Sequence, residues 1–192
     1  VMSSDDGATA VGHPEQGRDR SGSVDMTYIG VQPCQWTFES DNIREWVEAR
    51  LRGRVLNACA GPTRLDHDGE IVTNDLDESL CVDYHVDATQ LSEHFGSEFD
   101  TVVFDPPFSA YQATTRYGGR STGYDTAMKR EIAAVLRDGG RGIQMGYTTT
   151  CMPRAMDFNT EAVAVFRTLG RQNDILGVVD ERINHEVTGW SE

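Results

Sequence analysis

Apolar residues along the chain follow helical spacing in some stretches and form short continuous runs in others, which predicts a mixed α/β domain. Three stretches with helical spacing, each ending near a glycine, predict helices over residues 40–52, 124–137 and 160–169. Shorter apolar runs predict strands over residues 54–58, 70–74, 82–86, 101–104, 141–147 and 174–179. The last of these strands can continue to Ile183.

Strands that alternate with helices imply a mostly parallel, Rossmann-like sheet of six or seven strands, with a ligand site at the carboxyl ends of the strands. The connections around the second strand are unusually short: about ten residues follow Gly61 before it begins. A parallel crossover usually needs a dozen residues or more. We therefore expect the first two crossover helices to be shortened or missing. Part of one sheet face would then be bare and need cover from the N-terminal segment, a second copy or a partner subunit.

Length and composition predict one folded domain over residues 24–192, preceded by a disordered tail over residues 1–23 that has hardly any apolar content. No apolar run is long enough to span a membrane and no signal-peptide pattern is present, so we expect a cytoplasmic protein. The cysteines and histidines are scattered, with no metal-ligand spacing. We therefore predict free thiols and no metal.

The formal net charge is −14, from 31 acidic and 17 basic residues, and Lys129 is the single lysine. An acidic chain with almost no lysine is typical of a halophilic protein, because carboxylates hold hydration while molar salt screens their repulsion. The alternative is an ordinary acidic protein that avoids nucleic acid. On the halophilic interpretation, the global charge does not exclude a nucleic-acid substrate.

The most informative stretch is the tetrapeptide Asp105-Pro106-Pro107-Phe108, which follows the apolar run 101–104. Proline fixes φ and lacks an N–H, so the two prolines make a stiff, non-helical corner at the end of the strand. This corner presents a carboxylate, a free carbonyl and an aromatic ring together. Such a set can bind a planar group that carries an amine, with acceptors for its N–H bonds and a ring to stack on it.

Other strands end in residues suited to a ligand. The first strand runs into Asn57-Ala58-Cys59-Ala60-Gly61, where small side chains allow a close backbone approach and Gly61 can adopt a positive φ. The second strand ends near Asp75 and Asp77, either of which could accept hydrogen bonds from ribose hydroxyls. The third ends in Asp87-Ala88, although Asp87 could also act only as a helix cap.

Over residues 36–180, the order and content of these segments resemble the amino-directed branch of the class I S-adenosylmethionine-dependent methyltransferases, which carry a [DNS]-P-P-[YFW] motif after the fourth strand. The chain departs from that branch in having one glycine in the first loop, where two or three are common.

The resemblance implies a role for each of these segments. The loop 57–61 would hold the methionine part of S-adenosylmethionine, Asp75 (or else Asp77) the ribose, and Asp87-Ala88 the adenine amine. The segment Trp36-Thr37-Phe38-Glu39 would close over the methionine end, although packing in the core is an equally good interpretation of Trp36 and Phe38. On the acceptor side, Asp105 and the Pro106 carbonyl would accept from the target amine, Pro107 would stiffen the corner and Phe108 would stack on the base.

Two stretches of this acidic chain contain no acid at all, residues 106–124 and residues 139–156. The first also carries aromatic and basic residues that could grip a phosphate backbone and stack on bases, namely Tyr111, Arg116, Tyr117 and Arg120. The alternative is a neutral lid over the cofactor.

The resemblance therefore implies a methyltransferase acting on an exocyclic amine of a nucleic-acid base, with adenine N6 in DNA as the first candidate. Methylation of RNA, such as guanine N2 of ribosomal RNA, is the main alternative, because compact relatives carry the same motif. A glutamine amide is less favoured, since that group usually has Asn where this chain has Asp105. A non-catalytic subunit that keeps the fold is a further alternative. A nicotinamide dehydrogenase is disfavoured, because the chain lacks a Gly-x-Gly-x-x-Gly turn.

Overall fold

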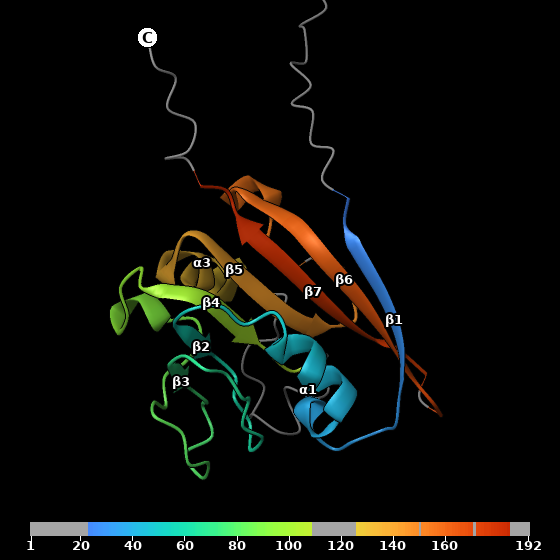
Figure 1. Ribbon diagram of the computed structural model, residues 1–192. Helices are drawn as coiled ribbons and strands as arrows, with labels where there is room; N and C mark the ends of the chain where they lie inside the picture. Colours follow the sequence, from blue (N-terminus) through green and yellow to red (C-terminus); the bar gives the residue numbers. More distant parts are fainter. Residues whose placement is uncertain (1–22, 109–125, 150, 171, 185–192) are drawn as a thin grey trace, which may run out of the picture.

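The structure is a computed structural model that describes residues 23–108, 126–149, 151–170 and 172–184. Its centre is a single seven-stranded sheet in the order β1-β6-β7-β5-β4-β2-β3 (Figure 1). The strands are β1 (Asp25–Val31), β2 (Val55–Asn57), β3 (Ile71–Thr73), β4 (Phe99–Phe104), β5 (Leu136–Gly146), β6 (Phe158–Thr168) and β7 (Ile175–Arg182). Only β7 runs antiparallel to its neighbours β5 and β6, and the other pairs are parallel. The predicted Rossmann-like, mostly parallel sheet is confirmed.

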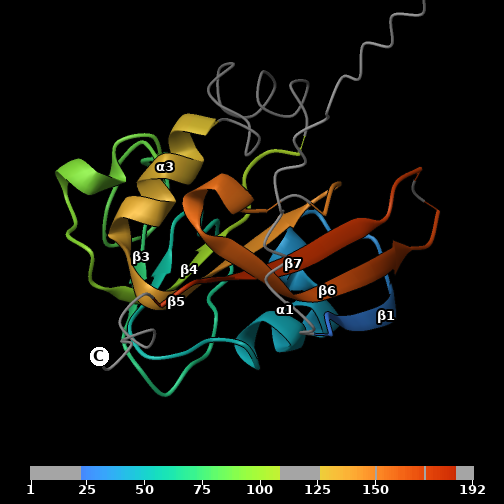
Figure 2. The same ribbon diagram turned by 90° about the horizontal axis from the view of Figure 1, so that it is seen from above.

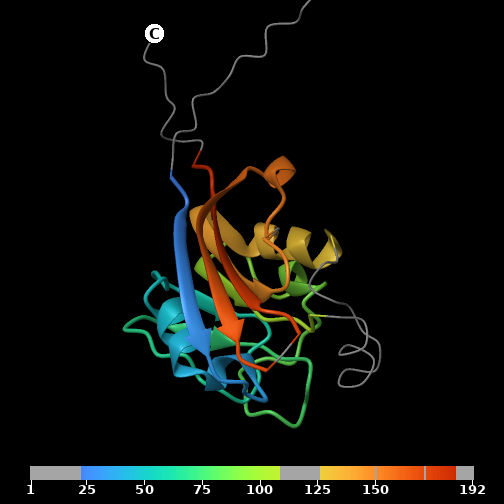
Figure 3. The ribbon, with the colours of Figure 1, turned by 90° about the vertical axis from the view of Figure 1, so that its right-hand side faces the viewer.

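Within the described residues, two α-helices cover opposite faces of the sheet, α1 (Asp41–Glu48) and α3 (Thr126–Val135), as Figures 2 and 3 show. Side chains of successive strand residues alternate between the faces. Val103 therefore joins the core under α1 and Val102 the core under α3, and both are fully buried. Both helices lie within the stretches 40–52 and 124–137 in which helices are predicted.

The first two crossover helices are missing, as predicted. Residues 58–70 contain no helix, and neither do residues 74–90 before the short 3-10 helix Leu91–Glu93. The prediction that a bare face results is wrong at β2. Leu65, from the helix-free connection, belongs to the same core as Val55, and Val55 is fully buried. An apolar residue in extended chain therefore covers this part of the sheet without a second subunit.

The predicted helix over residues 160–169 is wrong, because this stretch lies in strand β6. Its apolar residues are buried on both faces of the sheet: Ala162, Ala164 and Phe166 lie in the α1 core and Val163 lies in the α3 core. The strand β1 was not predicted at all. It pairs in parallel with β6 at the edge of the sheet, and Met26 and Tyr28 are exposed there.

The predicted strand over residues 82–86 is reduced to one isolated bridge, between Asn74 and Tyr84. The other predicted strands are present, although β5 begins earlier than expected, at Leu136. The predicted tail lies, apart from Ser23, outside the described residues, and the domain boundary at residue 24 stays a prediction. In the described part of the chain, no helix has both the length and the apolar character needed to cross a bilayer.

Candidate functional site

The Asp105-Pro106-Pro107-Phe108 corner lies directly after β4, at the carboxyl end of the central parallel strands. Three hollows in the surface meet there, and Asp105 is the one described residue that lines all three. Ligands of open α/β sheets bind at this end of the strands. The corner therefore occupies the position at which both a cofactor and a second molecule could reach the same carboxylate.

The large hollow has a volume of about 150 Å³ and lies between the corner and the connection that leads from β1 to α1. One wall is formed by Pro106, Pro107 and Phe108, and the other by residues 31–37. Tyr147, just after β5, closes a further side. This hollow combines one buried carboxylate with aromatic and proline surfaces, which suits a planar group carrying an amine.

Two smaller hollows lie on the other side of Asp105. The β3 hollow, of about 60 Å³, is lined by residues from the loops after β2 and β3, including Ala58, Cys59, Asp75, Asp87 and Ala88. The Gly61 hollow, of about 30 Å³, is lined by Cys59, Ala60, Gly61, Asp75, Thr37 and Phe38, among others. Because Cys59 and Asp75 line both, the two small hollows adjoin at these residues, and together they are called the trough.

Asp105 is held in an unusual electrostatic setting. Burial raises the pKa of its carboxyl to about 7, opposed by a hydrogen bond from the Thr37 side chain and reinforced by the nearby charge of Asp75. Its Oδ1 atom is buried and accepts no hydrogen bond from any described residue. A buried acceptor without a partner is costly in a folded protein, and an incoming N–H would satisfy it.

The loop after β2 takes the conformation that its sequence predicts. Gly61 has φ of +60°, in the left-handed region, so its predicted positive φ is confirmed. Asp75 fixes this loop, because its Oδ2 accepts from the Gly61 N–H at 2.8 Å while its Oδ1 accepts from the Asp77 N–H at 2.9 Å. The buried Asp75 carboxylate therefore ties the loops after β2 and β3 together beside the trough.

Of the other polar residues predicted to bind the cofactor, Asp87 lines a hollow, whereas Asp77 and Asn57 do not. Asp87 lines the β3 hollow and also accepts from the Thr89 N–H and hydroxyl, so it closes a turn, although no α-helix follows. Asp77 is exposed, accepts from Ser79 and lines none of the three hollows. Asn57 is buried on β2 and lines none of them either. The structure therefore brings Asp75 and Asp87 to the trough but not Asp77 or Asn57.

Cys59 is a further component of the trough. Burial, then the nearby charge of Asp75, raise the pKa of its thiol far above the usual range, so the thiol stays neutral. Cys59 lines both small hollows together with Asp105, and it belongs to the loop that the resemblance assigns to the cofactor.

Two aromatic residues meet at the large hollow. The rings of Phe108 and Tyr147 lie edge to face, with centroids 4.9 Å apart and planes at 66°. Sequence analysis identified Phe108 but missed Tyr147, whose position at the end of β5 was an available signal. It also missed residues 31–35 as a wall, because no local pattern shows that β1 lies beside β6. Tyr111, Arg116, Tyr117 and Arg120 lie outside the described residues.

Comparisons with known proteins concern the fold alone. No protein-family model and no curated protein matches the sequence. Among solved structures, TrmN from Thermus thermophilus is 18% identical with a TM-score of 0.54, covering 75% of this chain and 49% of that one. A Burkholderia thailandensis 1,6-didemethyltoxoflavin-N1-methyltransferase, solved with 1,6-didemethyltoxoflavin and S-adenosylhomocysteine, is 15% identical with a TM-score of 0.52, covering 73% and 76%. The [4+2]-cyclase SpnF is 13% identical with a TM-score of 0.55, covering 75% and 81%.

These likenesses are too distant to transfer an activity, and the inclusion of a cyclase shows that the fold does not fix the reaction. The chain also spans about half the length of the TrmN chain. What the comparisons show is that the chain has the Rossmann-like methyltransferase fold.

Proposed function

We propose that this protein is an S-adenosylmethionine-dependent methyltransferase that modifies an exocyclic amine of a nucleic-acid base, with adenine N6 in DNA as the first candidate. The observation that carries the proposal is the position of Asp105, where the trough along β2 and β3 meets the large hollow. One carboxylate can thus face a cofactor on one side and an acceptor on the other.

The trough suits the cofactor. Small side chains and the left-handed Gly61 leave room for a close backbone approach, while Asp75 and Asp87 offer acceptors for hydroxyl and amine groups. Bound S-adenosylmethionine would supply a methyl group on a cationic sulfur, which is a good leaving group. We assign Ala58, Cys59, Ala60, Gly61, Asp75, Asp87 and Ala88 to this role, and Asn57 to support of the loop.

The corner suits the acceptor. The Asp105 Oδ1 atom and the Pro106 carbonyl would accept the two N–H bonds of a base amine, which withdraws its lone pair from the ring and aims it at the methyl group. The N–C bond forms as the C–S bond breaks, and the ionised Asp105 can take the proton that the nitrogen loses. Phe108 and Tyr147 would stack on the base. Catalysis of this kind depends mainly on positioning and desolvation, and a base in a duplex must first be flipped out.

Charge around the large hollow supports a polyanionic substrate. Residues 26–38, which include one wall of the hollow, contain no acid, and neither do residues 106–124 or 139–156, which follow β4 and include most of β5. The described parts of these stretches that line the large hollow are residues 31–37, 106–108 and Tyr147, and the absence of acids among them reduces the repulsion of phosphates in a chain with 31 acids. This charge distribution supports a nucleic-acid substrate over a small acceptor molecule. It does not distinguish DNA from RNA.

The proposal is tested by methyl transfer. Protein and methyl-labelled S-adenosylmethionine are incubated with unmodified DNA or RNA at potassium chloride concentrations up to about 2 M, and nucleosides are resolved by mass spectrometry. We expect labelled N6-methyladenine in DNA. Label on guanine in RNA would replace the first candidate by the second. Absence of label together with absence of cofactor binding by calorimetry would reject an enzyme and favour a non-catalytic subunit.

Replacing Asp75 by Ala should weaken binding of S-adenosylhomocysteine by about tenfold or more, because the loops after β2 and β3 lose two charge-assisted hydrogen bonds. Calorimetry measures this directly. The matched control is Asp77→Ala, which removes an exposed carboxylate outside the trough and should change affinity by less than about threefold. Equal losses in both variants, or a larger loss in Asp77→Ala, would show that Asp77 is the ribose-binding acid.

A further inference from the structure

Asn74 joins two walls of the β3 hollow. It directly follows β3 and is fully buried. Its Nδ2 atom donates to the carbonyls of Ala58 and Val86, at 3.0 Å each, and its Oδ1 atom accepts from the Val86 N–H at 2.9 Å. An amide side chain has two N–H donors and one carbonyl oxygen, so every polar group of this side chain is engaged. The amide therefore fixes Ala58 and Val86 relative to each other.

The Asn74 side chain takes the place of strand pairing at Val86. The segment 82–86 meets the end of β3 at the isolated bridge between Asn74 and Tyr84, where the Asp75 N–H donates to the Tyr84 carbonyl at 3.1 Å. Two residues further on, the Asn74 amide bonds both the N–H and the carbonyl of Val86, as the backbone of a paired strand would. Because residues 74–90 contain no helix, this side chain holds a segment that lies outside regular secondary structure.

Both partners of the amide line the β3 hollow, as do Asp87 and Ala88, the two residues that follow Val86. Asn74 itself lines none of the three hollows, so it can influence a ligand only through the residues that it holds. Its backbone carbonyl accepts from the Ala60 N–H at 2.9 Å, a bond that a side-chain substitution leaves in place. A change of the side chain should therefore move the segment around Val86 more than the loop after β2.

We propose that Asn74 is a positioning residue for the cofactor: its amide sets the separation between Ala58 and Val86, and with it the width of the β3 hollow and the place of Asp87. This rests on the proposed function, because it takes the trough as the site of S-adenosylmethionine. Asn74 would touch no part of the cofactor. Its effect would fall on the adenine end, which the family resemblance brings to Asp87-Ala88.

Asn74→Asp tests this role, since it keeps the size of the side chain and an acceptor for the Val86 N–H. Its ionised carboxyl cannot donate, so one oxygen would face the carbonyls of Ala58 and Val86. We expect S-adenosylhomocysteine to bind about tenfold or more weakly than to wild type at about pH 9, as measured by calorimetry. The kcat at saturating cofactor should stay within about threefold of wild type, because Asp105 and the acceptor side are unchanged.

The matched control is Thr73→Val, which breaks a contact between the same two segments outside the three hollows. The Thr73 hydroxyl donates to the Asp83 carboxylate at 2.7 Å and accepts from the Asp83 N–H at 3.0 Å. Thr73→Val should change the affinity for S-adenosylhomocysteine by less than about threefold. Equal losses of affinity in Thr73→Val and Asn74→Asp would overturn the inference, because general loosening of the segment would then explain both.

Acid should restore binding to Asn74→Asp, which a merely disrupted fold would not show. Burial beside two carbonyls should raise the pKa of the introduced carboxyl, and its protonated form can donate to one of them while still accepting from the Val86 N–H. The deficit relative to wild type should therefore shrink to about threefold at about pH 6. The titratable neighbours Asp75, His85 and Asp87 are the same in both proteins, so the ratio of affinities at each pH isolates the introduced group. A deficit that stays constant or grows with acid would contradict the proposed role.

Hydrogen exchange in unliganded wild type provides a measurement that does not depend on the folding of a variant. The Val86 N–H and both side-chain protons of Asn74 should exchange slowly, and rapid exchange of any of them would overturn the inference. The outcome for the proposed function is distinguishable. Wild type that binds S-adenosylhomocysteine but transfers no methyl group would reject the proposed function and leave the role of Asn74 standing. Wild type that binds no S-adenosylhomocysteine would overturn that role.

Discussion

Asp105→Ala should lower kcat for methyl transfer by at least about 100-fold while leaving S-adenosylhomocysteine affinity within a few-fold of wild type. Among the residues that the structure describes, Asp105 alone lines all three hollows, and its Oδ1 atom, which has no hydrogen-bond partner among them, is the acceptor available to orient an amine. Loss of a single preorganised polar group at a reacting centre typically lowers kcat by about 100-fold or more. Single-turnover kinetics, with calorimetry for the cofactor, measure the two effects separately.

The control is Asp68→Ala, which removes an exposed carboxylate from the connection between β2 and β3 that lines none of the three hollows. It should be as active as wild type. If Asp105→Ala keeps more than about a tenth of the wild-type kcat, Asp105 is not the group that orients the amine. The acceptor would then have to be held by backbone carbonyls alone.

The titration of Asp105 gives the expected pH dependence. Its pKa is raised to about 7 by burial, so wild-type activity should rise as pH increases through about 7 in the free enzyme. The same shift costs stability: an acid whose pKa is raised on folding binds its proton more tightly in the folded state, so stability falls as pH rises from the unfolded value toward 7. Asp105→Asn has no carboxyl to titrate at this position, so it lacks this cost. In thermal melts, the loss of stability between acid pH and about pH 8 should therefore be smaller in Asp105→Asn than in wild type.

The ligand-facing ends of the parallel strands were the best-predicted part of the molecule. Asp105, Gly61, Asp75 and Asp87 were each identified by a strand followed by a turn residue or an acid, and the fold brings all four to the same edge. Sequence suffices here because parallel strands share a direction, so residues that follow them converge whatever their separation in the chain. Side-chain choice within a cluster was less predictable, as Asp77 shows: it follows Asp75 by two residues but turns outward to Ser79.

Strand β6 could not be recognised because its burial hides its periodicity. A strand covered on both faces reads as a nearly continuous apolar run, which helical spacing fits equally well. Residues 162–166 contain such a run, and the glycine at 170 resembles a helix stop. This stretch forms a strand because it pairs with β7 and β1, and no local sequence pattern indicates that these two strands are its partners. The wall of the large hollow was missed for the same reason, since the paired residues of β1 and β6, such as Asp25 and Ala162, lie 137 positions apart in the sequence.

Phe166→Ala should lower the free energy of unfolding by about 3–5 kcal/mol, the second large effect that the structure predicts. Phe166 is fully buried on β6 and lies edge to face with Trp46 of α1, with centroids 5.7 Å apart and planes at 85°. Gly177 of β7 makes room for this pair, because a Cβ there would lie 2.7 Å from the Trp46 ring and 3.1 Å from the Phe166 ring. Truncation would open a cavity between the helix and the sheet that the surrounding strands cannot close. Urea unfolding followed by circular dichroism measures the change.

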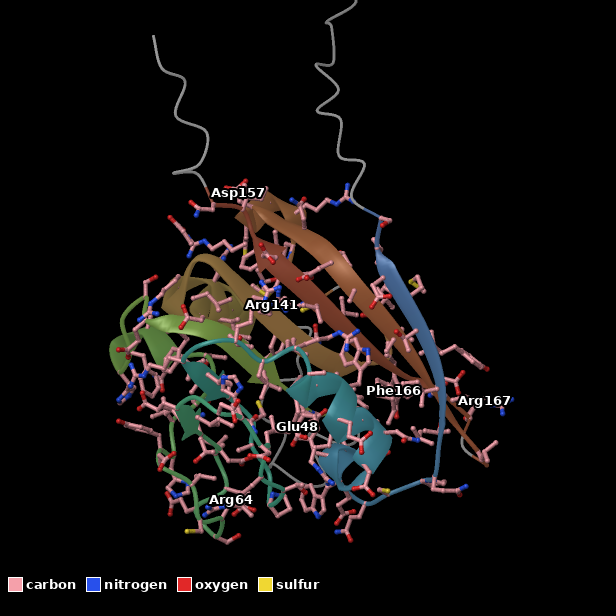
Figure 4. The ribbon with its side chains drawn as sticks, viewed as in Figure 1. Glu48, Arg64, Arg141, Asp157, Phe166 and Arg167 are labelled. Atoms are coloured by element: carbon pink, nitrogen blue, oxygen red, sulfur yellow. The ribbon has the colours of Figure 1, made fainter. Side chains whose placement is uncertain are left out.

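The neighbour on the same strand provides the control. Arg167 is exposed and lies over the ring of Tyr28 at 6.0 Å, and Figure 4 labels it beside Phe166. Arg167→Ala should change stability by no more than about 0.5 kcal/mol. A strong contrast between these adjacent residues is what a strand with one buried and one outward side chain requires. Because Thr168, two residues after Phe166, lines the large hollow, partial loss of packing at Phe166 should also weaken acceptor binding before it unfolds the protein. If the two variants were equally stable, the contact between α1 and β6 would not hold the sheet together, and the wall of the large hollow would need another support.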